Sequence, residues 1–120
     1  MPNVLAAGFR AVFHIFDAWG LDNRQAMALL GFPARSTFFK WKQGKIGIVP
    51  HDTVQRLSYI LGIYKALQIL YREPADADAW VKRPSAAFGG VSALDRMTGG
   101  DITDLAAVRA RLDAARGGVA

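Results

Sequence analysis

The sequence predicts an all-α fold on three observations. Apolar residues recur at three- and four-residue intervals, the spacing of one face of a helix. Side-chain pairs that cap helix N-termini precede several of these segments, and glycine or proline follows most of them. No run of alternating apolar and polar residues is long enough to suggest a β-strand. The 52% of hydrophobic residues in this 120-residue chain is sufficient for a packed core.

The first predicted helix spans residues 4–19. Its apolar residues fall at positions i, i+4, i+7, i+8 and i+11 and form one stripe, which comprises Leu5, Phe9, Val12, Phe13 and Phe16. Gly20 is expected to end this helix, because glycine is the residue that most often terminates one.

Two short helices come next, with a sharp turn between them. Asp22 and Gln25 form a capping-box pair, which predicts a helix over residues 22–30. Gly31 can adopt the positive φ that ends a helix, and the next helix is predicted over residues 35–43.

The rest of the chain is predicted to form one long helix and several short ones. Asp52 and Gln55 suggest another cap pair, at the start of a largely apolar helix that reaches about Tyr71. Prolines and glycine pairs divide the chain beyond this helix. Shorter helices are predicted over residues 75–81, 92–97 and 101–115, with Ser92 and Asp101 or Thr103 as caps and an irregular segment at 84–91.

The composition excludes several classes of function. Without cysteine, the chain has no disulfide, no Cys-ligated metal site and no thiol nucleophile. Its only histidines, His14 and His51, lack a metal-ligating partner at helical spacing, and no glycine-rich phosphate loop is present. We therefore expect no enzymatic activity, no cofactor and no metal. The apolar stretch 57–71 is too short to span a membrane and no signal peptide is recognised, so we expect a cytoplasmic protein.

The positive charge is concentrated in the first part of the chain. Residues 1–72 carry nine Lys/Arg and three Asp, a net charge of +6, whereas residues 73–120 carry six Lys/Arg and seven Asp/Glu, a net charge of −1. No acidic residue lies between Asp22 and Asp52. Such a basic stretch suits a polyanion, most simply a nucleic-acid backbone, although a solvated basic face is the plainer alternative.

Residues 22–45 have the layout of a helix-turn-helix. Ala26 is small enough for two helices to cross closely, Gly31 permits the sharp turn, and the second helix carries polar and basic residues. Phe38 and Trp41 lie three residues apart and predict its buried side. The outward side chains are then candidates for contact with DNA: Arg35, Ser36, Thr37, Lys40, Lys42, Gln43 and Lys45. Similar helix pairs also occur in proteins that do not bind DNA.

The long central helix is apolar on more than one face. A helix of this kind must be enclosed either by its own chain or by a partner. Full enclosure is difficult in so small a chain, so we expect a dimer or partner interface at Leu57, Ile60, Leu61, Ile63, Tyr64 and Leu67. The alternative is a central helix wrapped by the other helices of the same chain.

The second half of the chain carries a pattern that resembles one family. The pattern runs from RLSYILGIYKALQIL at residues 56–70, through Trp80, Pro84, FGG at 88–90 and ALDRM at 93–97, to Gly100, Asp104–Leu105 and Val108–Arg109. In this order, and after a helix-turn-helix, these pieces resemble the Xre/MbcA/ParS antitoxins, the partners of RES-domain toxins. Two positions depart from the family pattern, since many relatives have Asn where this chain has Ser85 and Pro where it has Ala93.

The resemblance implies an Xre-like helix-turn-helix that binds the operator of its own operon, followed by a small helical toxin-binding domain. The toxin would consume NAD or transfer ADP-ribose, and the antitoxin would cover its active site, as a homodimer within a larger complex. The candidate toxin-binding residues are Trp80, Lys82, Arg83, Phe88, Gly89, Gly90, Leu94, Arg109 and Arg116. Two alternatives stay open: Phe88 could fill the core, and Arg109 could pair with Asp113 on a solvated helix face.

The chain is accordingly divided into three parts: a DNA-binding region at residues 1–50, a central helix at 51–73 that serves as an interface, and a toxin-binding region at 74–120. The favoured function is that of a type II antitoxin that neutralises a RES-domain toxin and represses its own operon. One alternative is a stand-alone transcription regulator without a toxin. Another is a protein-binding module whose helix-turn-helix no longer binds DNA.

Overall fold

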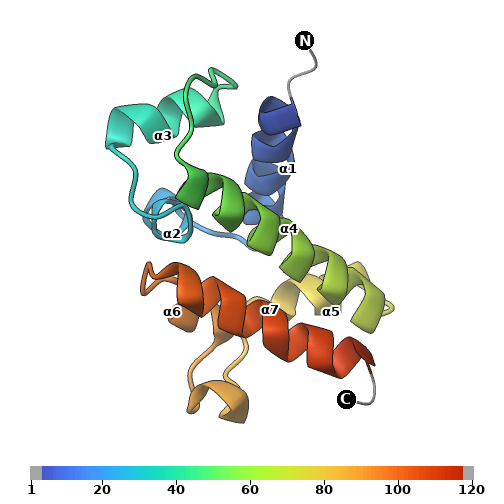
Figure 1. The fold of residues 1–120 in the computed structure, drawn as a ribbon. Coiled ribbons are helices and arrows are strands. Elements are labelled where there is room, and N and C mark those ends of the chain that lie inside the picture. Colours follow the sequence, from blue (N-terminus) through green and yellow to red (C-terminus); the bar gives the residue numbers. More distant parts are fainter. Residues whose placement is uncertain (1–3, 118–120) are drawn as a thin grey trace.

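Helix α4 (His51–Leu70) runs through the centre of the molecule, and the other helices lie around it (Figure 1). The computed structural model describes residues 4–117. Helix α1 (Val4–Ala18) packs against α4, and α7 (Ile102–Gly117) lies along much of its length. Because α4 contacts elements from both halves of the chain, it connects the N-terminal helices to the C-terminal ones.

The N-terminal helices α2 (Asn23–Leu29) and α3 (Arg35–Lys42) are separated by a short turn, as predicted. The capping box of α2 is confirmed. The Gln25 backbone N–H donates to Asp22 Oδ1 at 2.8 Å, and the Asp22 backbone N–H donates to Gln25 Oε1 at 3.0 Å. Gly31 adopts φ of 87°, which confirms the predicted left-handed conformation after α2.

The C-terminal half is built from short elements that come after α4. They are α5 (Pro74–Ala79), the 3-10 helices η1 (Trp80–Lys82) and η2 (Ala86–Phe88), and α6 (Ala93–Met97). The predicted capping residue Ser92 accepts a hydrogen bond from the Asp95 backbone N–H at 3.0 Å. Asp101 caps α7, since its Oδ1 accepts from the Thr103 backbone N–H at 2.9 Å. Both of these predicted caps are confirmed.

The predicted cap pair Asp52–Gln55 is wrong. The residue that precedes α4 is Pro50, and no side chain within residues 4–117 caps this helix end. The Asp52 carboxylate instead accepts a hydrogen bond from Arg56 Nε at 2.7 Å. An aspartate in a first helical turn can pair with a basic residue four positions later as readily as it can act as a cap, and here the ion pair forms.

The prediction of an all-α fold is confirmed. Within residues 4–117 the sole β feature is an isolated bridge between Pro84 and Ser92. One continuous core contains apolar side chains from both halves, including Phe9, Phe38 and Leu105. Over the same described residues, no helix is long and apolar enough to cross a membrane.

The central helix is enclosed by its own chain, so the predicted interface is wrong for four of its six residues. Leu57, Ile60, Ile63 and Leu67 are each at most 4% exposed. Helices α1, α5 and α7 all pack against α4 and together cover these side chains. The alternative of a wrapped central helix therefore describes this part of the fold, and only Leu61 and Tyr64 of the six stay partly accessible to a partner.

Candidate DNA-binding and partner-binding surfaces

Helix α3 is held on the molecule by its aromatic side. Phe38 and Trp41 are buried, as predicted. The Trp41 ring lies 4.8 Å from the ring of Phe9, and the Phe38 ring lies 5.5 Å from that of Phe13, measured between centroids. These contacts join α3 to α1 and direct the opposite face of α3 to solvent.

The seven predicted DNA-binding residues all lie outside the core. Thr37 is half-buried and the others are exposed, namely Arg35, Ser36, Lys40, Lys42, Gln43 and Lys45. Two of the cations are oriented by neighbours. Lys42 Nζ donates to Asn23 Oδ1 at 2.9 Å, and the Arg35 guanidinium lies 4.9 Å from the centroid of the Phe39 ring. The resulting surface is rich in donors and contains no carboxylate of α3.

The start of α3 also suits an anion. Ala34 precedes the helix, and no side chain in the described part of the chain caps the first backbone N–H groups of α3. Free N–H groups at a helix N-terminus, reinforced by the helix dipole, favour phosphate oxygens. The N-terminus of α3 and its lysines can therefore contact the same polyanion.

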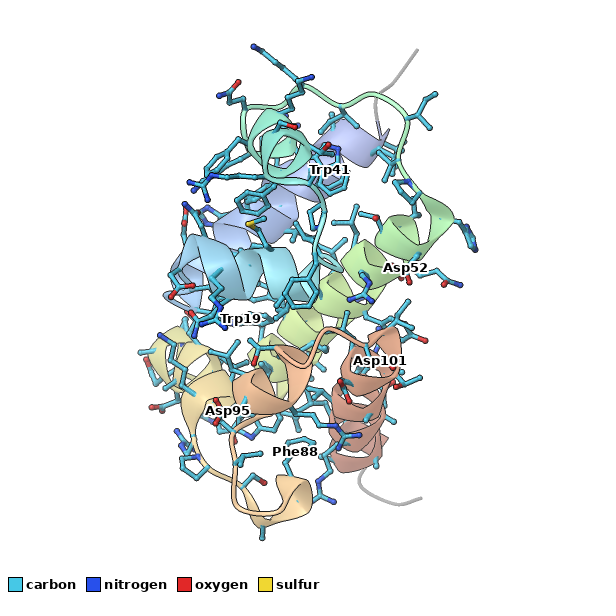
Figure 2. All side chains as sticks on the ribbon, turned by 90° about the vertical axis from the view of Figure 1, so that its left-hand side faces the viewer. Trp19, Trp41, Asp52, Phe88, Asp95 and Asp101 are labelled. Atoms are coloured by element: carbon cyan, nitrogen blue, oxygen red, sulfur yellow. The ribbon has the colours of Figure 1, made fainter. Side chains whose placement is uncertain are left out.

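The C-terminal half presents a projecting loop at residues 83–92. Figure 1 shows it extending away from the helices, at the end of the molecule opposite α3. The loop is closed by a hydrogen bond from the Ser85 N–H to the Val91 carbonyl oxygen at 3.0 Å. The Phe88 ring lies between the loop and the helices, in an edge-to-face contact with Trp80 at 6.2 Å (Figure 2).

The predicted toxin-binding residues fall into three groups. Lys82, Arg83, Gly89, Gly90 and Arg116 are exposed, and Trp80, Phe88 and Arg109 are half-buried. Leu94 is a core residue, 4% exposed, so its prediction as a contact residue is wrong. The reason is that α6 turns this side chain inward once Ser92 has fixed the start of the helix.

Two of the predicted cations are engaged within the chain. Arg109 donates from Nε to Asp113 at 3.0 Å, and a Cβ at Gly62 would overlap the Arg109 guanidinium. Arg109 thus lies across α4, in the space that a glycine leaves. Lys82 Nζ donates to the Gly20 carbonyl oxygen at 3.1 Å while staying exposed.

Two recesses mark places where a partner could bind. One, of about 720 Å³, lies between α1, the end of α3 and α4, and its lining includes Leu61, Tyr64 and Arg10. The other, of about 330 Å³, lies between the ends of α4 and α7, where Leu70, Trp80 and Arg111 line it. The second recess borders the projecting loop through Ser85, which is also one of its lining residues.

Arg56 is a structural residue that the sequence pattern did not single out. Its side chain is 7% exposed and forms hydrogen bonds with three parts of the chain. Nearby, hydrogen bonds from the Thr103 backbone and hydroxyl lower the pKa of Asp101, and the positive charge of Arg56 lowers it further. The spacing of Asp52 and Arg56 was the available signal for the ion pair, but nothing local indicated the two more distant contacts.

Among residues 4–117 no group of three metal-ligating side chains comes together. The candidate surfaces are formed by exposed cations at one end of the molecule, by the recess beside them that Lys42 and Gln43 also line, and by the projecting loop with the recess that borders it.

Comparisons with known proteins match both halves of the chain. Residues 6–62 match the antitoxin Xre-like helix-turn-helix domain, and residues 66–118 match the antitoxin Xre/MbcA/ParS C-terminal toxin-binding domain. The two matches meet within α4. The chain is also 51% identical, over 112 residues, to the uncharacterized protein y4oB of Sinorhizobium fredii (strain NBRC 101917 / NGR234). That alignment covers 93% of this chain and 86% of the relative.

Proposed function

This chain belongs to the Xre/MbcA/ParS antitoxin family, and from that premise we propose that it neutralises a RES-domain toxin and represses its own operon. Membership of this family implies a DNA-binding helix-turn-helix, a toxin-binding domain and a regulatory rather than a catalytic role. The proposal adds the class of toxin, the mode of inhibition and the DNA target. Both activities take place in the cytoplasm, where operon DNA and toxin are found together.

The observation that carries the proposal is the separation of the two surfaces. The basic face of α3 and the projecting loop lie at opposite ends of a molecule whose longest extent is 40 Å (Figure 2). A toxin bound around the loop therefore leaves α3 free to contact DNA. One chain can serve as an antitoxin and as a repressor at the same time.

Inhibition is proposed to occur by covering the toxin's NAD site. Arg83, Arg111 and Arg116 are exposed near the loop and the end of α7, and NAD carries a pyrophosphate. A cleft that binds this anion must itself offer positive charge, which repels arginines. We therefore expect these arginines to pair with acidic residues at the rim of the cleft, while the loop supplies the apolar contact. Phe88 is the proposed anchor, because aromatic side chains dominate the energetics of many interfaces.

Co-expression with a RES-domain protein encoded beside this chain tests the proposal. Purified toxin is expected to consume NAD, and addition of the full chain is expected to abolish that consumption. Phe88→Ala and Arg116→Ala are expected to weaken inhibition by about tenfold or more, the size of a strong interface contact. Lys65→Ala, an exposed cation on α4, is the matched control and should inhibit normally.

The same variants separate the alternatives. If Phe88 fills the core instead, Phe88→Ala lowers the melting temperature while the folded fraction inhibits normally. If the intact chain binds operator DNA tightly and leaves NAD consumption unchanged, the chain is a stand-alone regulator and the neutralisation proposal fails. If the wild-type chain neither binds operator DNA nor inhibits the toxin, the proposal as a whole is contradicted.

A homodimer is proposed to form through the recess beside α1. Helix-turn-helix proteins usually read two half-sites as dimers, and the recess holds Leu61 and Tyr64, the two predicted interface residues that stay accessible. Tyr64→Ala with Leu61→Glu is expected to raise the dimer dissociation constant by at least tenfold in sedimentation experiments. Lys65→Glu, adjacent in sequence but outside the recess lining, should self-associate as the wild type does. If both variants have the dissociation constant of the wild type, the dimer contact lies elsewhere.

A further inference from the structure

The turn that introduces α3 is held by a residue of α4. Arg56 Nη1 donates to the carbonyl oxygen of Leu29 at 3.4 Å, at the end of α2. Its Nη2 donates at 2.8 Å to the carbonyl oxygen of Gly100, in the loop that joins α6 to α7. With Asp52 bound to Nε, every nitrogen of this guanidinium donates a hydrogen bond. One side chain thus connects the helix-turn-helix to the C-terminal half.

The turn makes a second contact with the same loop. Phe32 follows Gly31 and has φ of 56°, a left-handed conformation that residues with a Cβ rarely adopt. Its ring lies against Gly100, where a Cβ would overlap it. A conformation of this kind persists only where the surroundings hold it in place. Here the Arg56 hydrogen bonds and the Gly100 contact constrain both sides of the turn.

There is little room for the turn to take another course. A Cβ at Gly31 would come within 2.9 Å of Arg56 Nε, so the backbone of the turn lies directly on the guanidinium. Two residues beyond Phe32, Ala34 provides no side-chain cap for α3. The direction in which α3 starts is therefore determined by the turn and by its contacts, in addition to the aromatic contacts with α1.

We propose that Arg56 and the Phe32–Gly100 contact are positioning elements for DNA recognition, through which the C-terminal half sets the orientation of α3. The inference rests on the proposed DNA-binding function of α3. None of these groups needs to touch DNA. They act because base contacts require the reading helix to sit at one angle in the groove, whereas phosphate contacts tolerate small rotations.

The test compares specific with non-specific binding of the full chain. One probe is a duplex covering the promoter directly upstream of the chain's own gene, and the other is a random-sequence duplex of equal length. Arg56→Met removes the three hydrogen bonds and keeps an unbranched side chain that reaches about as far as Arg Nε. It is expected to reduce the ratio of the two affinities by about tenfold, the size of one lost base contact.

A second variant guards against a general loss of folding. Phe32→Gly removes the ring that packs on Gly100, and glycine adopts the positive φ without steric cost. Phe32 is already 58% exposed, so this change removes little buried apolar area. We expect a several-fold drop in the affinity ratio with an unchanged melting temperature. Arg56→Lys, which keeps the charge but not the fork of donors, should fall between wild type and Arg56→Met.

Controls separate positioning from charge and from stability. Arg72→Met removes the same charge from an exposed site and should leave the affinity ratio unchanged. Partial unfolding lowers both affinities equally and also leaves the ratio unchanged. Lys40→Ala, by contrast, should reduce the salt dependence of non-specific binding, which Arg56→Met should preserve.

The inference is overturned if Arg56→Met and Phe32→Gly both keep the wild-type affinity ratio while the wild-type chain prefers the promoter duplex. If the wild-type chain itself shows no preference for that duplex, the proposed repressor function fails first. The two failures are therefore distinguishable in one set of measurements.

Discussion

Replacing Phe38 by alanine is expected to destabilise the fold by about 3–5 kcal/mol, the usual cost of truncating a fully buried phenylalanine. Its side chain is fully buried, and its ring contacts those of Phe13 and Phe39 at centroid distances of 5.5 and 5.2 Å. Since small domains have a total stability of about 5–15 kcal/mol, this loss is a large share. Urea unfolding followed by circular dichroism measures it, and operator binding should fall with the folded fraction.

Phe39 supplies the matched control from the next position on the same helix. It is only partly buried and lies beneath the Arg35 guanidinium, so Phe39→Ala removes less buried area. We expect a destabilisation of about 1–2 kcal/mol from the smaller transfer and cation–π contributions. Equal losses for the two variants would mean that α3 is rotated so that both rings are equally buried.

Loss of two lysines near the reading helix is expected to have the largest effect on DNA affinity. Lys40 and Lys45 are both exposed, and each phosphate contact releases about 0.9 counterions. At about 0.15 M salt this amounts to about fivefold in affinity per contact, so Lys40→Ala with Lys45→Ala should weaken binding by about 30-fold. The slope of log K against log salt is negative, and its magnitude should fall by about 1.8. Titration at four or five salt concentrations measures both quantities.

The control for this prediction removes two cations from another part of the surface. Lys65 and Arg72 are exposed, on α4 and directly after it. The double alanine variant changes the net charge equally but should keep the salt slope of the wild type. If both double variants reduced the magnitude of the slope by the same amount, the DNA contact would not be centred on α3. A solvated basic face would then be the better description of its lysines.

Capping pairs and glycine turns predicted the helix ends well, because the interactions that end a helix involve neighbouring residues. The capping boxes at Asp22 and Ser92 and the glycine turn at Gly31 each involve groups within a few residues of one another. The same reasoning failed at Asp52, where two local partners competed for one carboxylate. Its pairing with Arg56 was favoured once that guanidinium was fixed by two distant carbonyl groups, which no local pattern contains.

The predicted outward position of the candidate side chains divides in the same way, since it holds on α3 and fails for four residues of α4. The outward face of α3 followed from two aromatic residues three positions apart, and all seven of its candidate residues lie outside the core. For α4 the apolar pattern required enclosure but did not say by what. The fold resolved this by packing α1, α5 and α7 against the helix, so that Leu57, Ile60, Ile63 and Leu67 are buried.

The sequence by itself determined the all-α class, the order of helices, the basic outward face of α3 and, through its family pattern, the antitoxin assignment. These properties depend on spacing, capping and residue order, which are written along the chain. Only the tertiary structure decided which apolar faces are covered within the monomer, how Arg109 lies across α4, and that Arg56 joins the turn before α3 to the loop before α7. Such contacts join residues far apart in the chain, such as Arg109 and Gly62, which are 47 positions apart, and they depend on how whole helices pack.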